Sequence, residues 1–187
     1  MNELRPAVFL DRDGTINVEK EYLYKIEDFE YMDGAIEGLR QLQNWEYMLV
    51  IVTNQSGIAR GYYGEDEFRK LTNWMLCDME KHEIHIDGVY ICPHHPEGKI
   101  EKYRKICNCR KPKTGLFYQA ARECGIDFSK SIAIGDKMRD LEICRETGAH
   151  GFLLSEKCGS DKEITFCRDW TELIYHIGKM RMYVDIR

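Results

Sequence analysis

Short apolar runs, separated by longer amphipathic segments, are the feature that most constrains how this chain can fold. The run MLVIVT at Met48–Thr53 is continuous and rich in β-branched residues, which is typical of a strand buried on both faces. Similar runs predict strands at Ala7–Leu10, Gly88–Cys92, Ser131–Asp136 and Ala149–Leu154. Apolar residues spaced by three and four predict helices over Ala35–Leu42, Glu65–Glu80, Gly115–Cys124, Met138–Thr147 and Asp169–Met180.

Strands that alternate with helices in this way predict an α/β fold with a doubly wound, mostly parallel, Rossmann-like sheet. A chain of 187 residues is long enough for one domain with a substantial core. The sequence contains neither an internal repeat nor a low-complexity linker. We therefore expect a single domain over residues 1–187.

The composition excludes several classes of function. Hydrophobic residues make up 43% of the chain and charged residues 32%, which is ordinary for a soluble globular protein. A net charge of -5 disfavours a nucleic-acid partner, because most such proteins are basic. No apolar run approaches the roughly 20 residues of a membrane span, and the N-terminus lacks a signal-peptide pattern. We expect a cytoplasmic protein that binds neither membrane nor nucleic acid.

The eight cysteines fall into two groups. One group lies within a short segment and is considered below. The others are scattered and are expected to be reduced thiols, since a cytoplasmic chain of this length needs no disulfide framework. These scattered residues are Cys77, Cys124, Cys144, Cys158 and Cys167.

Polar residues occur where several of the predicted strands end. In doubly wound sheets, ligands bind outside the carboxyl ends of the strands. Asp11, Thr53, Cys92 and Asp136 each lie at or just beyond such an end. Residues that are far apart in the sequence are therefore predicted to meet at one edge of the sheet.

Three aspartates, Asp11, Asp13 and Asp136, should converge there, with Asp140 a possible fourth. Close carboxylates repel each other unless a cation lies between them, and Mg²⁺ prefers such oxygen ligands. A hydroxyl, an amide and positive charge should accompany them, from Thr53, Asn54, Lys111, Lys113 and Lys137. Each piece alone could be a turn or a helix cap. Their order at successive strand ends instead predicts a phosphoryl-transfer site.

The segments FLDRDGT, VTNQSG, RKPKTG and IGDKMRD resemble, in order, the four motifs of the haloacid-dehalogenase-like phosphatases. The resemblance extends from about Ala7 to about Leu154. It implies that Asp11 is the nucleophile that forms an aspartyl-phosphate and that Asp13 is the general acid and base. It also implies an Mg²⁺ site of Asp11, Asp13 and Asp136.

The same resemblance assigns phosphate-binding residues. Thr53 and Lys111 would hold the transferring phosphoryl group. The lysine of the family motif precedes a proline, which favours Lys111 over Lys113, and Lys137 could also reach the phosphate. The predicted phosphate- and substrate-binding set is Thr53, Asn54, Arg110, Lys111 and Lys137.

A cysteine-rich loop over about residues 92–110 carries the pattern C-x-H, twelve residues, C-x-C. Two close pairs of such ligands are typical of a closed, tetrahedral, structural zinc site. The ligands would be Cys92, His94, Cys107 and Cys109, with His95 as an alternative to His94. Free buried thiols or an oxidised pair are the simpler interpretations. A bound zinc would hold the following residues, Arg110 and Lys111, against the substrate.

This loop resembles one branch of the family, whose members act on heptose 1,7-bisphosphate or on histidinol phosphate. CPHHPEG followed by CNCRKP is more similar to the heptose enzymes, which implies a phosphorylated sugar substrate and removal of its C7 phosphate. Arg110 would then recognise the distal phosphate. Histidinol phosphate is the second candidate, and a zinc-containing nucleic-acid-binding module is the third. We expect a minimal cap and a monomer.

Overall fold

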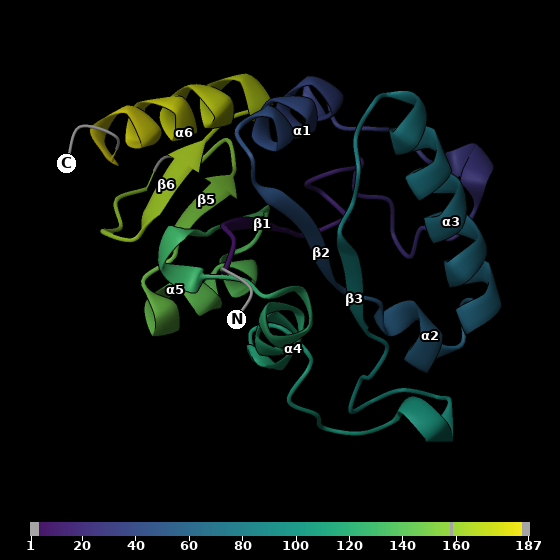
Figure 1. Ribbon diagram of the computed structural model, residues 1–187. Helices are drawn as coiled ribbons and strands as arrows, with labels where there is room; N and C mark the ends of the chain where they lie inside the picture. Colours follow the sequence, from purple (N-terminus) through teal and green to yellow (C-terminus); the bar gives the residue numbers. More distant parts are fainter. Residues whose placement is uncertain (1–3, 158, 185–187) are drawn as a thin grey trace.

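The computed structural model describes residues 4–157 and 159–184 and places a parallel sheet between two layers of helices (Figure 1). The strand order is β3-β2-β1-β4-β5-β6, and every neighbouring pair is parallel. This confirms the expected α/β class. The strands are β1 (Ala7–Leu10), β2 (Met48–Asn54), β3 (Gly88–Cys92), β4 (Ile132–Gly135), β5 (His150–Leu154) and β6 (Ile164–Cys167).

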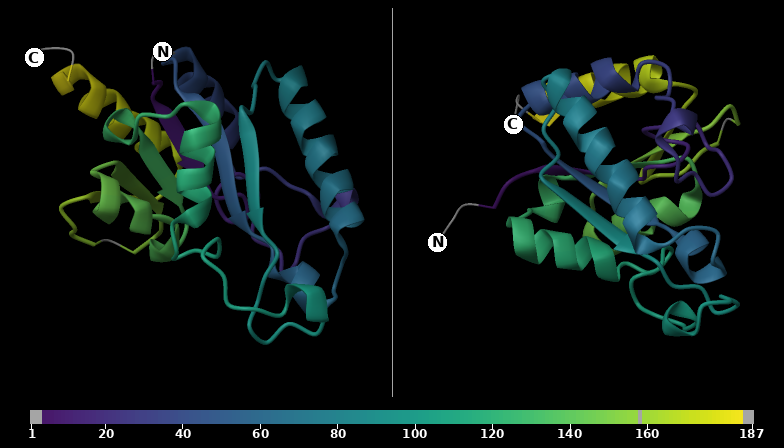
Figure 2. Two further views of the ribbon diagram at one scale, coloured as in Figure 1. Left: turned by 60° about the horizontal axis from the view of Figure 1, so that its bottom comes forward. Right: turned by 90° about the vertical axis from the view of Figure 1, so that its right-hand side faces the viewer.

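Helices cover both faces of the sheet, as the right-hand view of Figure 2 shows. One face packs against α1 (Ala35–Asn44), α3 (Glu65–Lys81) and α6 (Trp170–Val184), and the other against α4 (Gly115–Cys124) and α5 (Glu142–Thr147). The five-residue helix α2 (Ser56–Arg60) follows β2 directly. Short 3₁₀ turns are η1 (Ile26–Asp28), η2 (Glu101–Tyr103), η3 (Phe128–Lys130) and η4 (Met138–Asp140).

Strand β1 lies at the centre of the sheet and is buried on both faces. Val8 and Leu10 join the core under α1 and α6, whereas Ala7 and Phe9 join the core under α4. This alternation explains why the run is continuously apolar. Both neighbours of β1 are parallel, so β1, β2 and β4 all end at the same edge.

Several elements differ from the sequence-based expectation, among them the short helix α2, which was not predicted. Strand β6 was not predicted, because its four residues carry no turn signal or long apolar run. The expected helix over 138–147 is divided into η4 and α5. The Asp140 carboxylate accepts a hydrogen bond from the Lys137 backbone N–H at 3.1 Å. This local bond competes with helical hydrogen bonding, so the α-helix begins only after Asp140.

The segment between β1 and α1 forms the minimal cap expected from the sequence. Residues 15–33 contain one 3₁₀ turn, η1, and otherwise irregular chain. The indole N–H of Trp170 donates to the carbonyl of Thr15 at 2.9 Å and ties this segment to α6. Among the described residues, no helix is both long and apolar enough to cross a membrane.

Gly38 allows α1 to approach α6 closely, and this contact gives a test of the fold. A Cβ at Gly38 would lie 2.3 Å from the Trp170 ring, which is 1% exposed. Gly38→Ala should therefore lower the free energy of unfolding by about 1–3 kcal/mol, despite the better helix propensity of alanine. Urea unfolding measures the effect, and Glu37→Ala, at an exposed neighbouring position, should change little. An unchanged or raised stability of Gly38→Ala would contradict this packing.

Candidate active site

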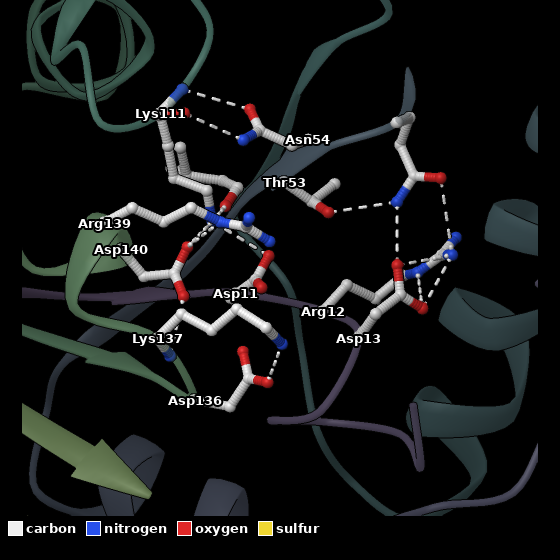
Figure 3. Close-up of polar contacts among 12 residues, drawn as sticks. Asp11, Arg12, Asp13, Thr53, Asn54, Lys111, Asp136, Lys137, Arg139 and Asp140 are labelled. Atoms are coloured by element: carbon white, nitrogen blue, oxygen red, sulfur yellow. Dashed lines mark hydrogen bonds and ion pairs between the residues drawn. The ribbon is translucent and has the colours of Figure 1, made fainter. Parts of the chain in front are cut away.

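The carboxyl ends of β1, β2 and β4 bring the predicted site residues together (Figure 3). Asp11 follows β1, Thr53 and Asn54 end β2, and Asp136 follows β4. Lys111 enters the same space from the loop before α4. The structure therefore assembles the groups that the strand-end rule places there.

Lys111 lies at the centre of the site and is 2% exposed. Its Nζ is 2.9 Å from Oδ1 of Asp11 and 2.8 Å from Oδ1 of Asp140, and it donates to the Val52 carbonyl at 2.7 Å. Burial disfavours the charge, but the two carboxylates outweigh burial and raise the pKa of Lys111. The ammonium therefore stays charged.

The backbone of Lys111 is held in place by Asn54. The side-chain amide of Asn54 donates to the Lys111 carbonyl and accepts from its N–H, both at 3.1 Å. This pair of bonds joins the end of β2 to the loop that carries the lysine. Lys113, the alternative lysine, is exposed and lies 3.5 Å from the side chain of Asn108, so the structure brings Lys111 and not Lys113 into the site.

Three carboxylates form a group that could hold a cation. Ligand atoms of Asp11, Asp136 and Asp140 lie within 4.8 Å of one another. Oδ1 of Asp136 is buried and has no hydrogen-bond partner among the described residues. A Cβ at Gly14, where φ is +82°, would lie 2.5 Å from Oδ2 of Asp136, so the close approach needs glycine. An all-oxygen set with an unpartnered carboxylate fits Mg²⁺.

Asp13 lies outside this group, and its carboxylate points away from Lys111 (Figure 3). It accepts hydrogen bonds from Arg12 Nε at 3.1 Å and Nη2 at 2.9 Å, from Asn17 Nδ2 at 3.1 Å and from Gln55 Nε2 at 3.0 Å. Asp140 takes the third place in the cluster. The expectation that Asp13 contributes to the Mg²⁺ site stays a prediction.

A cleft of about 440 Å³ opens above these groups. Lys137 lies on its rim, where its ammonium contacts Asp136 and is 3.7 Å from Glu19. Cationic and acidic side chains both line the cleft, and the cationic ones suit the anionic group of a polar ligand. The lining includes Thr53, Asn54, Gln55, Arg60, Arg110, Lys137 and Arg139 together with Glu19, Glu21 and Tyr22.

The cysteine loop brings its four predicted ligands together. Sγ of Cys109 is 3.2 Å from Sγ of Cys92, 3.3 Å from Sγ of Cys107 and 3.2 Å from Nδ1 of His94. These distances exceed the roughly 2.05 Å of a disulfide. His95 instead faces Arg60, with 3.0 Å between Nε2 and Nη2. The geometry suits one tetrahedral metal ion.

The loop also positions Arg110, which directly follows the last ligand. Its Nη1 donates to the His94 carbonyl at 3.3 Å, and the side chain reaches the cleft. The seven described cysteines are all free, and Cys158 lies outside the described residues.

Sequence reasoning missed three side chains of the polar network that holds Asp13: two donate to its carboxylate, and the third bonds to one of those two. This buried polar network lies beside the cleft and consists of Arg12, Gln55 and Tyr63. Their exposed fractions are 1%, 2% and 8%. Arg12 and Gln55 lie within two of the family motifs, but an arginine or a glutamine at these positions does not by itself predict a hydrogen bond to Asp13. The one pattern that could have indicated this network is the position of Arg12, a charged residue between two aspartates directly after a buried strand.

The fold and the site together define a class: a phosphoryl-transfer enzyme with a haloacid-dehalogenase-like fold. A protein-family model described as polynucleotide kinase 3 phosphatase matches residues 7–150. The D-glycero-beta-D-manno-heptose-1,7-bisphosphate 7-phosphatase of Haemophilus influenzae is 51% identical over 139 residues, which cover 74% of this chain and 75% of the relative. Its counterpart in Escherichia coli K12 is 47% identical over 137 residues, covering 73% and 72%.

Solved structures agree with these matches. A HAD-like phosphatase from Mesorhizobium loti superposes with a TM-score of 0.84 at 30% identity, covering 92% of this chain and 84% of the other. A D,D-heptose 1,7-bisphosphate phosphatase from B. bronchiseptica, complexed with magnesium and phosphate, gives a TM-score of 0.79 at 24% identity, covering 94% and 99%. The chain belongs to the family described as polynucleotide kinase 3 phosphatase and to that of the heptose-bisphosphate 7-phosphatases. It is a phosphatase.

The cysteine cluster predicts a specific metal content. Cys109→Ser should remove one ligand, reduce zinc from about one equivalent to well below half, and lower the thermal unfolding midpoint. Metal analysis and thermal unfolding of the purified proteins measure both effects. Cys77→Ser, an exposed cysteine outside the cluster, is the matched control and should retain wild-type zinc. A wild-type protein that is fully stable without zinc would contradict a structural metal.

Proposed function

We propose that this chain hydrolyses the C7 phosphate of D-glycero-D-manno-heptose 1,7-bisphosphate through an aspartyl-phosphate on Asp11. The observation that carries the chemistry is the cluster of Asp11, Asp136 and Asp140, two of which pair with the buried ammonium of Lys111. Thr53 lines the same cleft as Asp11. The observation that favours the substrate is the identity of about half to the heptose-bisphosphate phosphatases.

In the first step a carboxylate oxygen of Asp11 attacks phosphorus, and the bond between phosphorus and the C7 oxygen breaks. The leaving oxygen takes a proton from Asp13. In the second step Asp13 removes a proton from water, whose oxygen attacks phosphorus and releases phosphate and free Asp11. Lys111 and Thr53 hold the transferring group, and Lys111 also fixes the orientation of Asp11.

Mg²⁺, when bound by Asp11 and Asp136, would neutralise charge on the transferring phosphoryl group. Asp140 lies in the same cluster, and Asp13 is the further ligand expected from the sequence. Zinc in the cysteine loop would be structural, since all four ligands come from the protein.

The second phosphate of the substrate would meet the arginines of the cleft. Arg60, Arg110 and Arg139 all line it. Histidinol phosphate carries one phosphate and offers no second phosphate to these arginines, so it is the weaker candidate. A nucleic-acid substrate is also weaker, because the chain is acidic and Glu19 and Glu21 line the cleft.

Domain organisation and setting complete the proposal. We propose one domain over residues 1–187, acting as a cytoplasmic monomer on a small phosphorylated sugar. Free thiols at the described cysteines support a reducing compartment.

Removal of the nucleophile gives a direct test of the covalent mechanism. Asp11→Asn keeps the shape of the side chain but loses the attacking carboxylate, so phosphate release with Mg²⁺ should fall at least about 1,000-fold. Steady-state phosphate release measures it, with thermal unfolding to confirm the fold. Asp33→Asn, at an exposed position in the minimal cap, should keep wild-type activity. Substantial turnover by Asp11→Asn would contradict a mechanism through an aspartyl-phosphate on Asp11.

A substrate panel tests the specificity. We expect the highest kcat/KM for one anomer of heptose 1,7-bisphosphate, because two phosphates can engage both the carboxylate-lysine site and the arginines. The panel comprises both anomers, histidinol phosphate and a 3′-phosphorylated oligonucleotide, each with Mg²⁺. A higher kcat/KM for either of the last two would replace the proposed substrate.

A further inference from the structure

We propose that Tyr63 and Gln55 are positioning residues that orient the carboxylate of Asp13 for proton transfer to the leaving oxygen. This inference rests on the proposed role of Asp13 and adds a relay that runs from the Tyr63 hydroxyl through the Gln55 amide to Asp13. Three observations carry it: the donors on Asp13, the fixed direction of the Gln55 amide, and the enclosure of Tyr63.

Asp13 is held from one side by donors only. Arg12 contributes Nε and Nη2, Asn17 contributes Nδ2, and Gln55 contributes Nε2. Arg12 is itself buried, and its guanidinium lies 5.7 Å from the centre of the Phe68 ring. This set fixes both carboxylate oxygens, so the direction of Asp13 depends on these donors.

Gln55 can take only one orientation. Its Oε1 faces Arg12 Nη2 at 3.4 Å, and a guanidinium can only donate, so this atom must be the oxygen. The amide nitrogen therefore faces Asp13, and it also donates to Oγ1 of Thr53 at 3.0 Å. One buried amide thus connects the proton-transfer residue to a residue that would hold the phosphoryl group.

The hydroxyl of Tyr63 completes the relay. It donates to Oε1 of Gln55 at 2.6 Å, the shortest bond of this network. Burial raises the pKa of Tyr63, so the hydroxyl keeps its proton and remains a donor. Without it, the amide oxygen of Gln55 would retain only the long contact to Arg12.

The ring of Tyr63 is buried in a small hydrophobic cluster with Ile58 and Phe68. The ring stacks on Tyr24, with centroids 5.5 Å apart. A Cβ at Gly57 would lie 2.2 Å from the ring, so α2 can pass over it only with glycine there. The minimal cap and α2 therefore both hold the ring, and with it the hydroxyl, in place.

A relay of this kind affects one part of the reaction. Protonation matters more for a basic leaving group than for one that departs readily as an anion. The quantity kcat/KM covers the steps up to departure of the leaving group. If the carboxyl group of Asp13 is less well oriented, kcat/KM should fall for substrates with basic leaving groups and change little for substrates whose leaving group departs as an anion.

The test compares phenyl phosphate with p-nitrophenyl phosphate, which are similar in shape but differ in leaving-group basicity. Tyr63→Phe removes only the hydroxyl, and it should lower kcat/KM for phenyl phosphate about 10-fold more than for p-nitrophenyl phosphate. Tyr62→Phe, at a half-exposed neighbouring tyrosine, is the matched control and should keep the wild-type ratio. Equal loss on both substrates, or none, would overturn the relay.

A second variant and a double mutant test the same hydrogen-bond relay independently of Tyr63→Phe alone. Gln55→Leu removes the amide and should change the ratio in the same direction, which also covers the case in which Tyr63→Phe does not fold. In an Asp13→Asn background, Tyr63→Phe should have no further effect on the ratio. A full further effect there would overturn the relay alone, whereas an Asp13→Asn enzyme as active as wild type would overturn the proposed role of Asp13.

Discussion

The buried ammonium of Lys111 is the interaction on which the rest of the site depends. It lies between the carboxylates of Asp11 and Asp140, and all three side chains are withdrawn from solvent. Loss of this charge would leave two close, buried carboxylates without a partner, which is strongly unfavourable. The ion pairs thus offset the repulsion between two buried carboxylates at the end of a buried strand.

The fold serves this arrangement by bringing three strands to one edge. Strand β1 leads to Asp11, β2 ends at Thr53 and Asn54, and β4 leads to Asp136. The lysine comes from a loop, and loops need anchors to hold a charged side chain in a fixed place. Asn54 supplies one anchor through two backbone hydrogen bonds, and the cysteine loop just before it supplies the other.

Asp13 belongs to a different electrostatic environment from Asp11, although the two are neighbours in the sequence. Asp11 pairs with the ammonium of Lys111, whereas Asp13 turns into the network of Arg12 and Gln55. In a continuous strand, side chains two residues apart would point to the same face. Strand β1 ends at Leu10 and the chain bends at Arg12, so the two side chains lie in different surroundings. Two carboxylates in one motif can in this way take separate tasks, attack and proton transfer.

The sequence by itself determined the layout of this protein. Periodicity predicted five of the strands and the long helices, because strand and helix repeats are local properties of the chain. Motif order placed Asp11 and Lys111 in one site, and ligand spacing placed His94 in the cysteine cluster. Short elements such as β6 and α2 carry too few residues for a periodic signal.

Only the tertiary structure decided which polar side chains contact one another. It turned Asp140 into the carboxylate cluster and Asp13 out of it, and it enclosed Tyr63 against the motif that follows β2. These choices depend on which donors and acceptors meet across elements distant in the sequence. Hydrogen-bond partners of that kind are set by packing, so no local pattern in the chain records them.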